Sequence, residues 1–165
     1  MAPKRLGWDE YFLAIAETVS RRGTCDRGTT GCVIVKDKRI VATGYVGSPP
    51  GMPHCDEEGH LFAKAIEEDG KVHNHCIRTT HAEQNAICQA AKAGVSIDGA
   101  TLYCKIFPCF TCAKLLVTCG IKRVVAKNDY HSSKLAKDAF KRAGVQFEIV
   151  ERTVASYPDQ EHSGN

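Results

Sequence analysis

The chain has 165 residues, of which 43% are hydrophobic and 25% are charged, and its formal charge is +3. Its length suits one compact domain that buries about two-thirds of the unfolded surface, so we expect a single domain over residues 1–165 with a core at about 8–150. The small charge gives no reason to expect a nucleic-acid partner. Because the chain shows neither an apolar run of about 18 residues nor an apolar leader, we expect a cytoplasmic protein without a membrane span.

The first half of the chain opens with a predicted helix, because apolar side chains recur at a helical period over residues 8–22. Residues 32–45 predict a hairpin in which two apolar strands flank a polar turn. Residues 47–53 are rich in Gly and Pro and predict a loop. Residues 57–68 predict a short helix that ends at a turn formed by Asp69 and Gly70.

The second half alternates between helices and strands. Helices are predicted at about 81–93, 109–119 and 132–143, followed by strands at 100–104, 121–126 and 145–150. Such alternation indicates an α/β fold with parallel strands. Together with the hairpin, it predicts a three-layer αβα sandwich around a central mixed, partly parallel five-stranded sheet. Residues 155–165 are polar and predict a loose tail.

Candidate metal ligands stand at the starts of two predicted helices. Cys109 and Cys112 follow Pro108 and lie three residues apart, so their thiols share one helix face. The partial positive charge of a helix N-terminus favours the thiolate that zinc requires. His81 offers a third, nitrogen ligand. Three protein ligands with an open fourth position are typical of a catalytic zinc, which can acidify a water.

Glu83 follows His81 by two residues. Such positions point in roughly opposite directions on a helix (about 200° of rotation), so Glu83 is better placed for proton transfer than as a fourth ligand. The pattern H-x-E followed by P-C-x-x-C is the zinc deaminase signature. Cys-x-x-Cys alone is also compatible with a redox pair or with a structural zinc module in an interaction protein, but a structural site has no need of Glu83.

Several segments resemble the deoxycytidylate (dCMP) deaminases of the cytidine and deoxycytidylate deaminase superfamily. They are residues 44–51, 75–83, 107–112 and 129–131, and the resemblance covers about residues 8–150. It implies a cytidine deaminase-like fold and zinc-dependent hydrolysis of dCMP to dUMP and ammonia, which feeds thymidylate synthesis. Glu83 is then the group that passes protons from water to ring N3 and to the departing amine. Deamination of dCTP, CMP or tRNA adenosine is the alternative.

The resemblance also implies a site for the nucleotide phosphate. For the phosphate, Arg27 offers a permanent forked charge and Tyr130 a hydroxyl group; for Arg27 the alternative is a solvated surface charge. Ser48 is a further expected substrate contact. Val46 stands where the family usually has Asn. Because Val cannot hydrogen-bond a sugar or an effector nucleotide, we expect sugar selectivity or control by dCTP and dTTP to differ. Family members are often hexamers, so we expect a homo-oligomer.

Nine cysteines are too many for the catalytic site alone, and their odd number argues against a disulfide framework. Cys32, Cys88 and Cys104 lie in apolar patterns and are expected in the core. The resemblance implies a second, structural zinc bound by Cys25, Cys55, His60 and His75, with Cys76 as the competitor for the last place. A metal would order the loop-rich region 47–80. Free thiols and surface histidines are the alternative.

Overall fold

The computed structural model describes residues 4–151 and 153–155. Its sheet has the strand order β2-β1-β5-β6-β7, and a short strand β8 pairs with β6. The strands are β1 (Gly31–Lys36), β2 (Arg39–Tyr45), β5 (Thr101–Ile106), β6 (Arg123–Tyr130), β7 (Gln146–Ile149) and β8 (Val154–Ala155). β1 is antiparallel to β2 and β5, whereas β5, β6 and β7 run parallel. The predicted mixed sheet is confirmed, with β8 as an addition; nearly all of the predicted tail lies outside the described residues.

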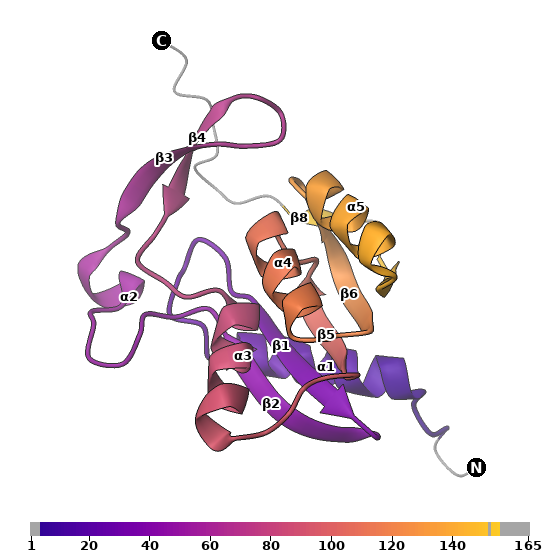
Figure 1. The fold of residues 1–165 in the computed structure, drawn as a ribbon. Coiled ribbons are helices and arrows are strands. Elements are labelled where there is room, and N and C mark those ends of the chain that lie inside the picture. Colours follow the sequence, from indigo (N-terminus) through magenta and orange to yellow (C-terminus); the bar gives the residue numbers. More distant parts are fainter. Residues whose placement is uncertain (1–3, 152, 156–165) are drawn as a thin grey trace.

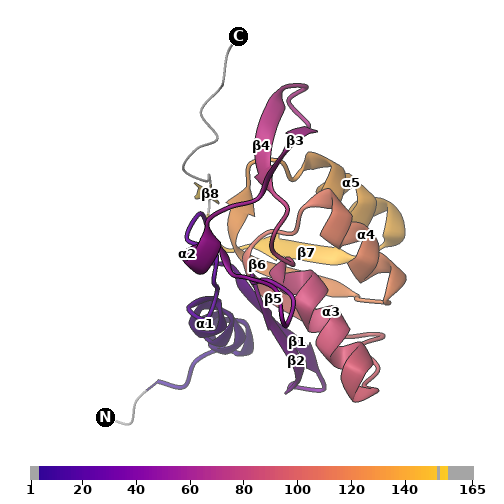
Figure 2. The same cartoon turned by 90° about the vertical axis from the view of Figure 1, so that its left-hand side faces the viewer.

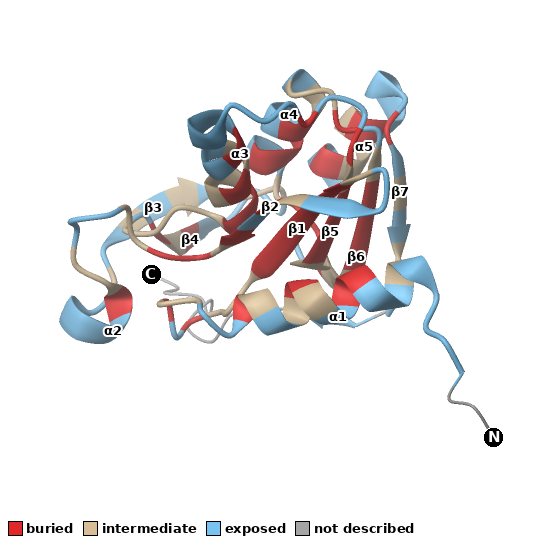
Figure 3. Ribbon diagram, turned by 90° about the horizontal axis from the view of Figure 1, so that it is seen from below, coloured by how far each residue is buried: buried red, intermediate tan, exposed pale blue. Residues whose placement is uncertain are grey.

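Helices cover both faces of the sheet, with α1 (Trp8–Ser20) on one face and three helices on the other (Figures 1 and 2). Those three are α3 (Ala82–Ala93), α4 (Phe110–Thr118) and α5 (Lys134–Ala143). Successive strand side chains point to opposite faces, so Val33 and Val35 pack with α1 while Cys32 and Ile34 join the core under the other helices. Figure 3 shows the buried side of α1 turned toward the strands. The three-layer sandwich is confirmed.

Within the described ranges, none of the helices has the length and apolarity needed to cross a bilayer.

The start of α3 is held tightly against β2. Gly44 allows this approach, because a methyl group there would overlap the carbonyl oxygen of Ala82. Asn85 Nδ2 also donates a hydrogen bond to the carbonyl oxygen of Tyr45, at 3.0 Å. These contacts fix the N-terminus of α3, and with it His81, over the end of β2.

The predicted helix at 57–68 is wrong. Residues Cys55–Glu58 form α2, a single turn, and β3 (Phe62–Ile66) pairs with β4 (Val72–Cys76) as a separate antiparallel hairpin. The side chains of β3 alternate between exposed and half-buried, which is a strand period. The hairpin projects from the body of the molecule above α2 (Figure 1). The turn at residues 69–70 is present.

The structure places two of the three expected core thiols in the core. Cys32 and Cys104 are buried, but Cys88 is exposed, so its expected burial is wrong. The helix α3 buries Ala86 and Ala90, and Cys88, midway between them, faces away from the sheet.

Candidate metal centre and active site

His81, Cys109 and Cys112 meet at the N-termini of α3 and α4. His81 and Cys109 immediately precede the two helices, and Cys112 lies in the first turn of α4. Nδ1 of His81 is 3.5 Å from Sγ of Cys109 and 3.5 Å from Sγ of Cys112. All three atoms lie within 4.8 Å of one another. The structure therefore brings together the three ligands expected from the sequence.

These separations fit a tetrahedral zinc ion. Zn–S bonds of about 2.3 Å and Zn–N bonds of about 2.0 Å place neighbouring ligand atoms about 3.5–3.8 Å apart. The pKa of Cys109 is lowered to about 4, mainly by its hydrogen bond with Cys112 and also by His81, although burial acts in the opposite direction. The same bond raises the pKa of Cys112. The pair thus shares a proton that a metal cation can replace.

Glu83 lies in the first turn of α3 and is only 7% exposed. Burial raises its pKa above the usual value, and the negative charge of Cys109 adds to the effect. Its carboxyl group contacts Cys112, yet among the described residues the three-ligand group does not include it. A buried carboxyl group with a raised pKa beside a metal site is suited to accept and return a proton.

A half-open pocket leads to this centre. Glu83, His81 and Cys109 line it, together with Cys25, Arg27, Gly28, Thr30, Val46, His75, Cys76, Thr79, Ile106, Phe107 and Tyr130. Five of these residues were not singled out as site residues from the sequence: Gly28, Thr30, Thr79, Ile106 and Phe107. Phe107 directly precedes the Pro-Cys motif, and this position was the available signal.

Two of the three expected substrate contacts reach the pocket. Arg27 is 9% exposed, so it is not a solvated surface charge; its Nη2 donates to the carbonyl oxygen of Asn74 at 3.2 Å, and its guanidinium lies over the Phe62 ring. Tyr130, at the end of β6, is also 9% exposed. Ser48 is not among the described residues that line the pocket, and its buried Oγ has no hydrogen-bond partner among them.

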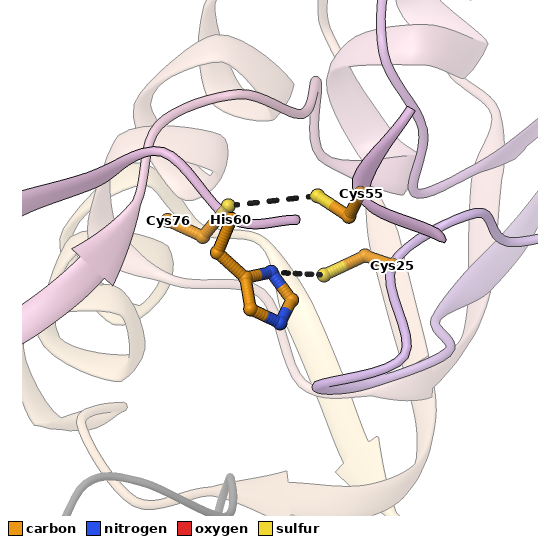
Figure 4. A group of neighbouring side chains, drawn as sticks. All are labelled: Cys25, Cys55, His60 and Cys76. Carbon is orange, nitrogen blue, oxygen red and sulfur yellow. Dashed lines mark hydrogen bonds between the residues drawn. The ribbon is translucent and has the colours of Figure 1, made fainter. Parts of the chain in front are cut away.

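A second group of potential ligands, the Cys₃His group, lies at the base of the β3–β4 hairpin (Figure 4). Its members are Cys25, Cys55, His60 and Cys76, with all ligand atoms within 4.8 Å of one another. The sulfurs of Cys55 and Cys76 are 3.7 Å apart, and Sγ of Cys25 is 3.9 Å from Nδ1 of His60. These separations are close to the edge lengths of a zinc tetrahedron. All three cysteines of the group are buried, and His60 is half-buried rather than a surface histidine.

The fourth member of this group is Cys76 rather than the expected His75. Neighbouring residues on a strand point to opposite sides, so only one of the two can face Cys55. The ring of His75 instead lies 5.7 Å from the ring of His81. The expected ligand set is corrected accordingly. The signal that sequence reasoning missed was a strand at 72–76, which fixes this alternation.

The surroundings of the Cys₃His group also suit a metal ion. Nε2 of His60 lies 3.2 Å from Oδ1 of Asp26, the carboxylate–histidine arrangement that orients imidazole ligands. Burial raises the pKa of Cys55 to about 12, and its hydrogen bond with Cys76 contributes. A bound cation would stabilise the thiolate form that burial disfavours.

Comparison with known proteins points to one family. The cytidine and deoxycytidylate deaminase zinc-binding region is recognised over residues 6–128. "ComE operon protein 2" of Bacillus subtilis is 42% identical over 148 residues, which cover 90% of this chain and 74% of that protein. The deoxycytidylate deaminase of Schizosaccharomyces pombe is 36% identical over 142 residues, which cover 86% of this chain but 44% of the yeast protein. This chain therefore spans less than half of that relative.

A solved structure supports the same relationship. The dCMP deaminase of cyanophage S-TIM5, in complex with dCMP and dUMP, matches with a TM-score of 0.69 and 30% sequence identity. The match covers 89% of this chain and 99% of the phage chain. The two chains thus share the mixed sheet with helices on both faces.

Proposed function

We propose that this chain, which belongs to the cytidine and deoxycytidylate deaminase family, hydrolyses dCMP to dUMP and ammonia. The observation that carries the proposal is the buried Glu83 carboxyl group beside the three-ligand group at the pocket wall. The named activities of the similar yeast and phage proteins support dCMP as the substrate.

The residues of the pocket divide the chemistry between them. A zinc ion held by His81, Cys109 and Cys112 would supply a Lewis acid that makes water nucleophilic near neutral pH. Glu83 is placed to take one proton from the attacking water and deliver it to ring N3. It would then take the remaining proton from the hydroxyl group on C4 and pass it to the amine, so that ammonia leaves and C4 becomes a carbonyl. Burial of Glu83 favours its protonated form, so it can hold the proton between these transfers.

The substrate phosphate is assigned to Arg27 and Tyr130. Both line the pocket, and the guanidinium group can bind a phosphate through more than one N–H. The contact of Arg27 with the backbone of Asn74 limits the orientations of the guanidinium group. Ser48 is left out of this assignment because it does not line the pocket.

The Cys₃His group is proposed to hold a second, structural zinc ion, so the protein binds two. It would connect the loop after α1, the single turn of α2 and the strand β4. Because β4 also supplies His75 to the pocket, such an ion would fix one wall of the active site.

Other expectations from the sequence and from the resemblance remain predictions. They are a single deaminase domain over residues 1–165, a homo-oligomer such as a hexamer, a cytoplasmic location and control by dCTP or dTTP. Val46 is buried and lines the pocket beside Cys25 and Cys76. Because an apolar side chain in this place cannot hydrogen-bond a nucleotide, we expect sugar selectivity or the response to effectors to differ from that of the family.

The test is Glu83→Gln, which keeps the size of the side chain and removes its acid–base function. We expect zinc to be retained while turnover of dCMP falls by about 10³-fold or more. Turnover of dCMP, dCTP, CMP and deoxycytidine is measured spectrophotometrically, with Glu10→Gln, an exposed carboxylate on α1, as the control. Near-normal activity of Glu83→Gln would exclude its catalytic role. A wild-type chain inactive on all four compounds would favour the structural zinc module or the tRNA substrate.

A further inference from the structure

The tip of the β3–β4 hairpin carries two acidic side chains that the proposed deamination does not use. The carboxylate oxygens of Glu68 accept hydrogen bonds from the backbone N–H groups of Lys134 and Leu135, both at 2.9 Å. These are the first two residues of α5, a ten-residue helix. The free N–H groups of a helix N-terminus attract anions, and here the chain supplies its own anion.

Glu67 extends this contact toward a residue of the pocket wall. Its Oε2 lies 2.6 Å from Nε2 of His131, and its side chain is only 11% exposed. The ring of His131 packs against the ring of Tyr130, with centroids 4.3 Å apart. Tyr130 lines the pocket and is assigned to the substrate phosphate. The acidic tip, Glu67 and Glu68, is therefore connected through His131 to Tyr130, the pocket residue assigned to the phosphate.

We propose that the acidic tip restricts the substrate to a nucleoside 5′-monophosphate. The inference rests on the proposed function, in which Arg27 and Tyr130 receive the phosphate. Further phosphates that continue past Tyr130 meet the 131–133 turn and the start of α5. There Glu68 already occupies two backbone N–H groups, and Glu67 adds a like charge. A triphosphate must displace the tip or accept this repulsion.

The hairpin is held at both ends, so displacement of the tip is opposed. Its base carries Cys76 of the Cys₃His group, and its middle is bonded to Arg27 through the carbonyl oxygen of Asn74. At the tip, the backbone N–H of Glu68 also approaches Oγ of Ser132, at 3.5 Å. The tip thus acts as a fixed wall, which makes Glu67 and Glu68 specificity-determining residues that do not touch the reacting atoms.

The test is Glu68→Ala, which frees the two N–H groups of α5. We expect the ratio of kcat/KM for dCMP to that for dCTP to fall about tenfold, the size of a favourable charge interaction at a helix N-terminus. Inhibition by inorganic tripolyphosphate should tighten by a similar factor. The matched control is Asp69→Asn, because the hydrogen bonds that Asp69 makes with the described residues lie within the hairpin, to Lys71 and His73. It should leave the ratio within about twofold, since it frees no donor of α5.

Three results would overturn the proposal. One is a wild-type enzyme that uses dCTP as well as dCMP. Another is an unchanged ratio in Glu68→Ala, whether both kcat/KM values fall together or neither changes. The third is an equal shift in Asp69→Asn, which would assign the effect to loosening of the hairpin. If wild type deaminates neither nucleotide, the proposed function fails separately. The role of the acidic tip is then decided by calorimetry of tripolyphosphate binding: tighter binding to Glu68→Ala than to wild type supports it, and equal binding refutes it.

Discussion

Replacing Cys76 by Ser and, separately, His75 by Asn distinguishes the two neighbours on β4 as ligands of the second metal ion. Only Cys76 faces Cys55, at 3.7 Å between the sulfurs, whereas His75 faces His81 across the pocket. We therefore expect the Cys₃His group to lose its metal in Cys76→Ser and to keep it in His75→Asn. The variants alter adjacent residues of one strand, so each serves as the control for the other.

The size of the effect follows from the four-ligand geometry. A structural zinc contributes about 10–16 kcal/mol of binding free energy, or about 3 kcal/mol for each of four ligands, so loss of one weakens binding roughly a hundredfold. At metal concentrations above the wild-type Kd, a hundredfold change in Kd removes up to about 2.7 kcal/mol of stability. For a chain of this size, that lowers Tm by about 5–10 °C.

The assay is elemental analysis after dialysis against a weak chelator, combined with thermal unfolding. We expect about two zinc ions per chain in wild type and His75→Asn, and about one in Cys76→Ser. Since His75 lines the pocket, His75→Asn should alter KM for dCMP while its Tm changes little. One zinc ion in the wild type, or loss of metal in His75→Asn but not in Cys76→Ser, would refute this reasoning.

Two further predictions concern the fold around the site. Gly44→Ala should lower the free energy of unfolding by about 1–3 kcal/mol, because the added methyl group overlaps the Ala82 carbonyl oxygen. The control is Gly7→Ala, whose added methyl group meets open space. Equal melting curves for Gly44→Ala and wild type would contradict the prediction. Hydrogen bonds from Arg123 hold the pKa of Asp9 below its usual 3.8, so this pair stabilises the fold above that pH and the contribution is lost as pH falls through the lower folded-state pKa. Asp9→Asn should therefore lower the free energy of unfolding at neutral pH by less than about 1 kcal/mol, because the pair is partly exposed. The difference in Tm between this variant and wild type should disappear in acid.

The sequence was most informative where chemistry and local structure depend on neighbouring residues. The helices at α1, α3, α4 and α5 and the strands of the main sheet follow from apolar periodicity, because each buries one face against the sheet. The three-ligand group also follows, since the spacing of Cys109 and Cys112 and the position of Glu83 after His81 are local properties. Residues 57–68 misled because their apolar residues cluster in a run at 61–66 that is too short to distinguish a helical from a strand period, and pairing with β4 fixed the conformation instead.

The sequence by itself therefore determined the fold class, the candidate catalytic ligands and the proton-transfer group. Only the tertiary structure decided which of two adjacent residues joins the Cys₃His group, because that depends on the side of β4 that faces Cys55. It also decided that Arg27 is buried at the pocket while Ser48 stays outside it. The contact of Glu68 with α5 joins residues 66 positions apart. No local pattern encodes such a contact, since it exists only after the hairpin has folded against the sheet.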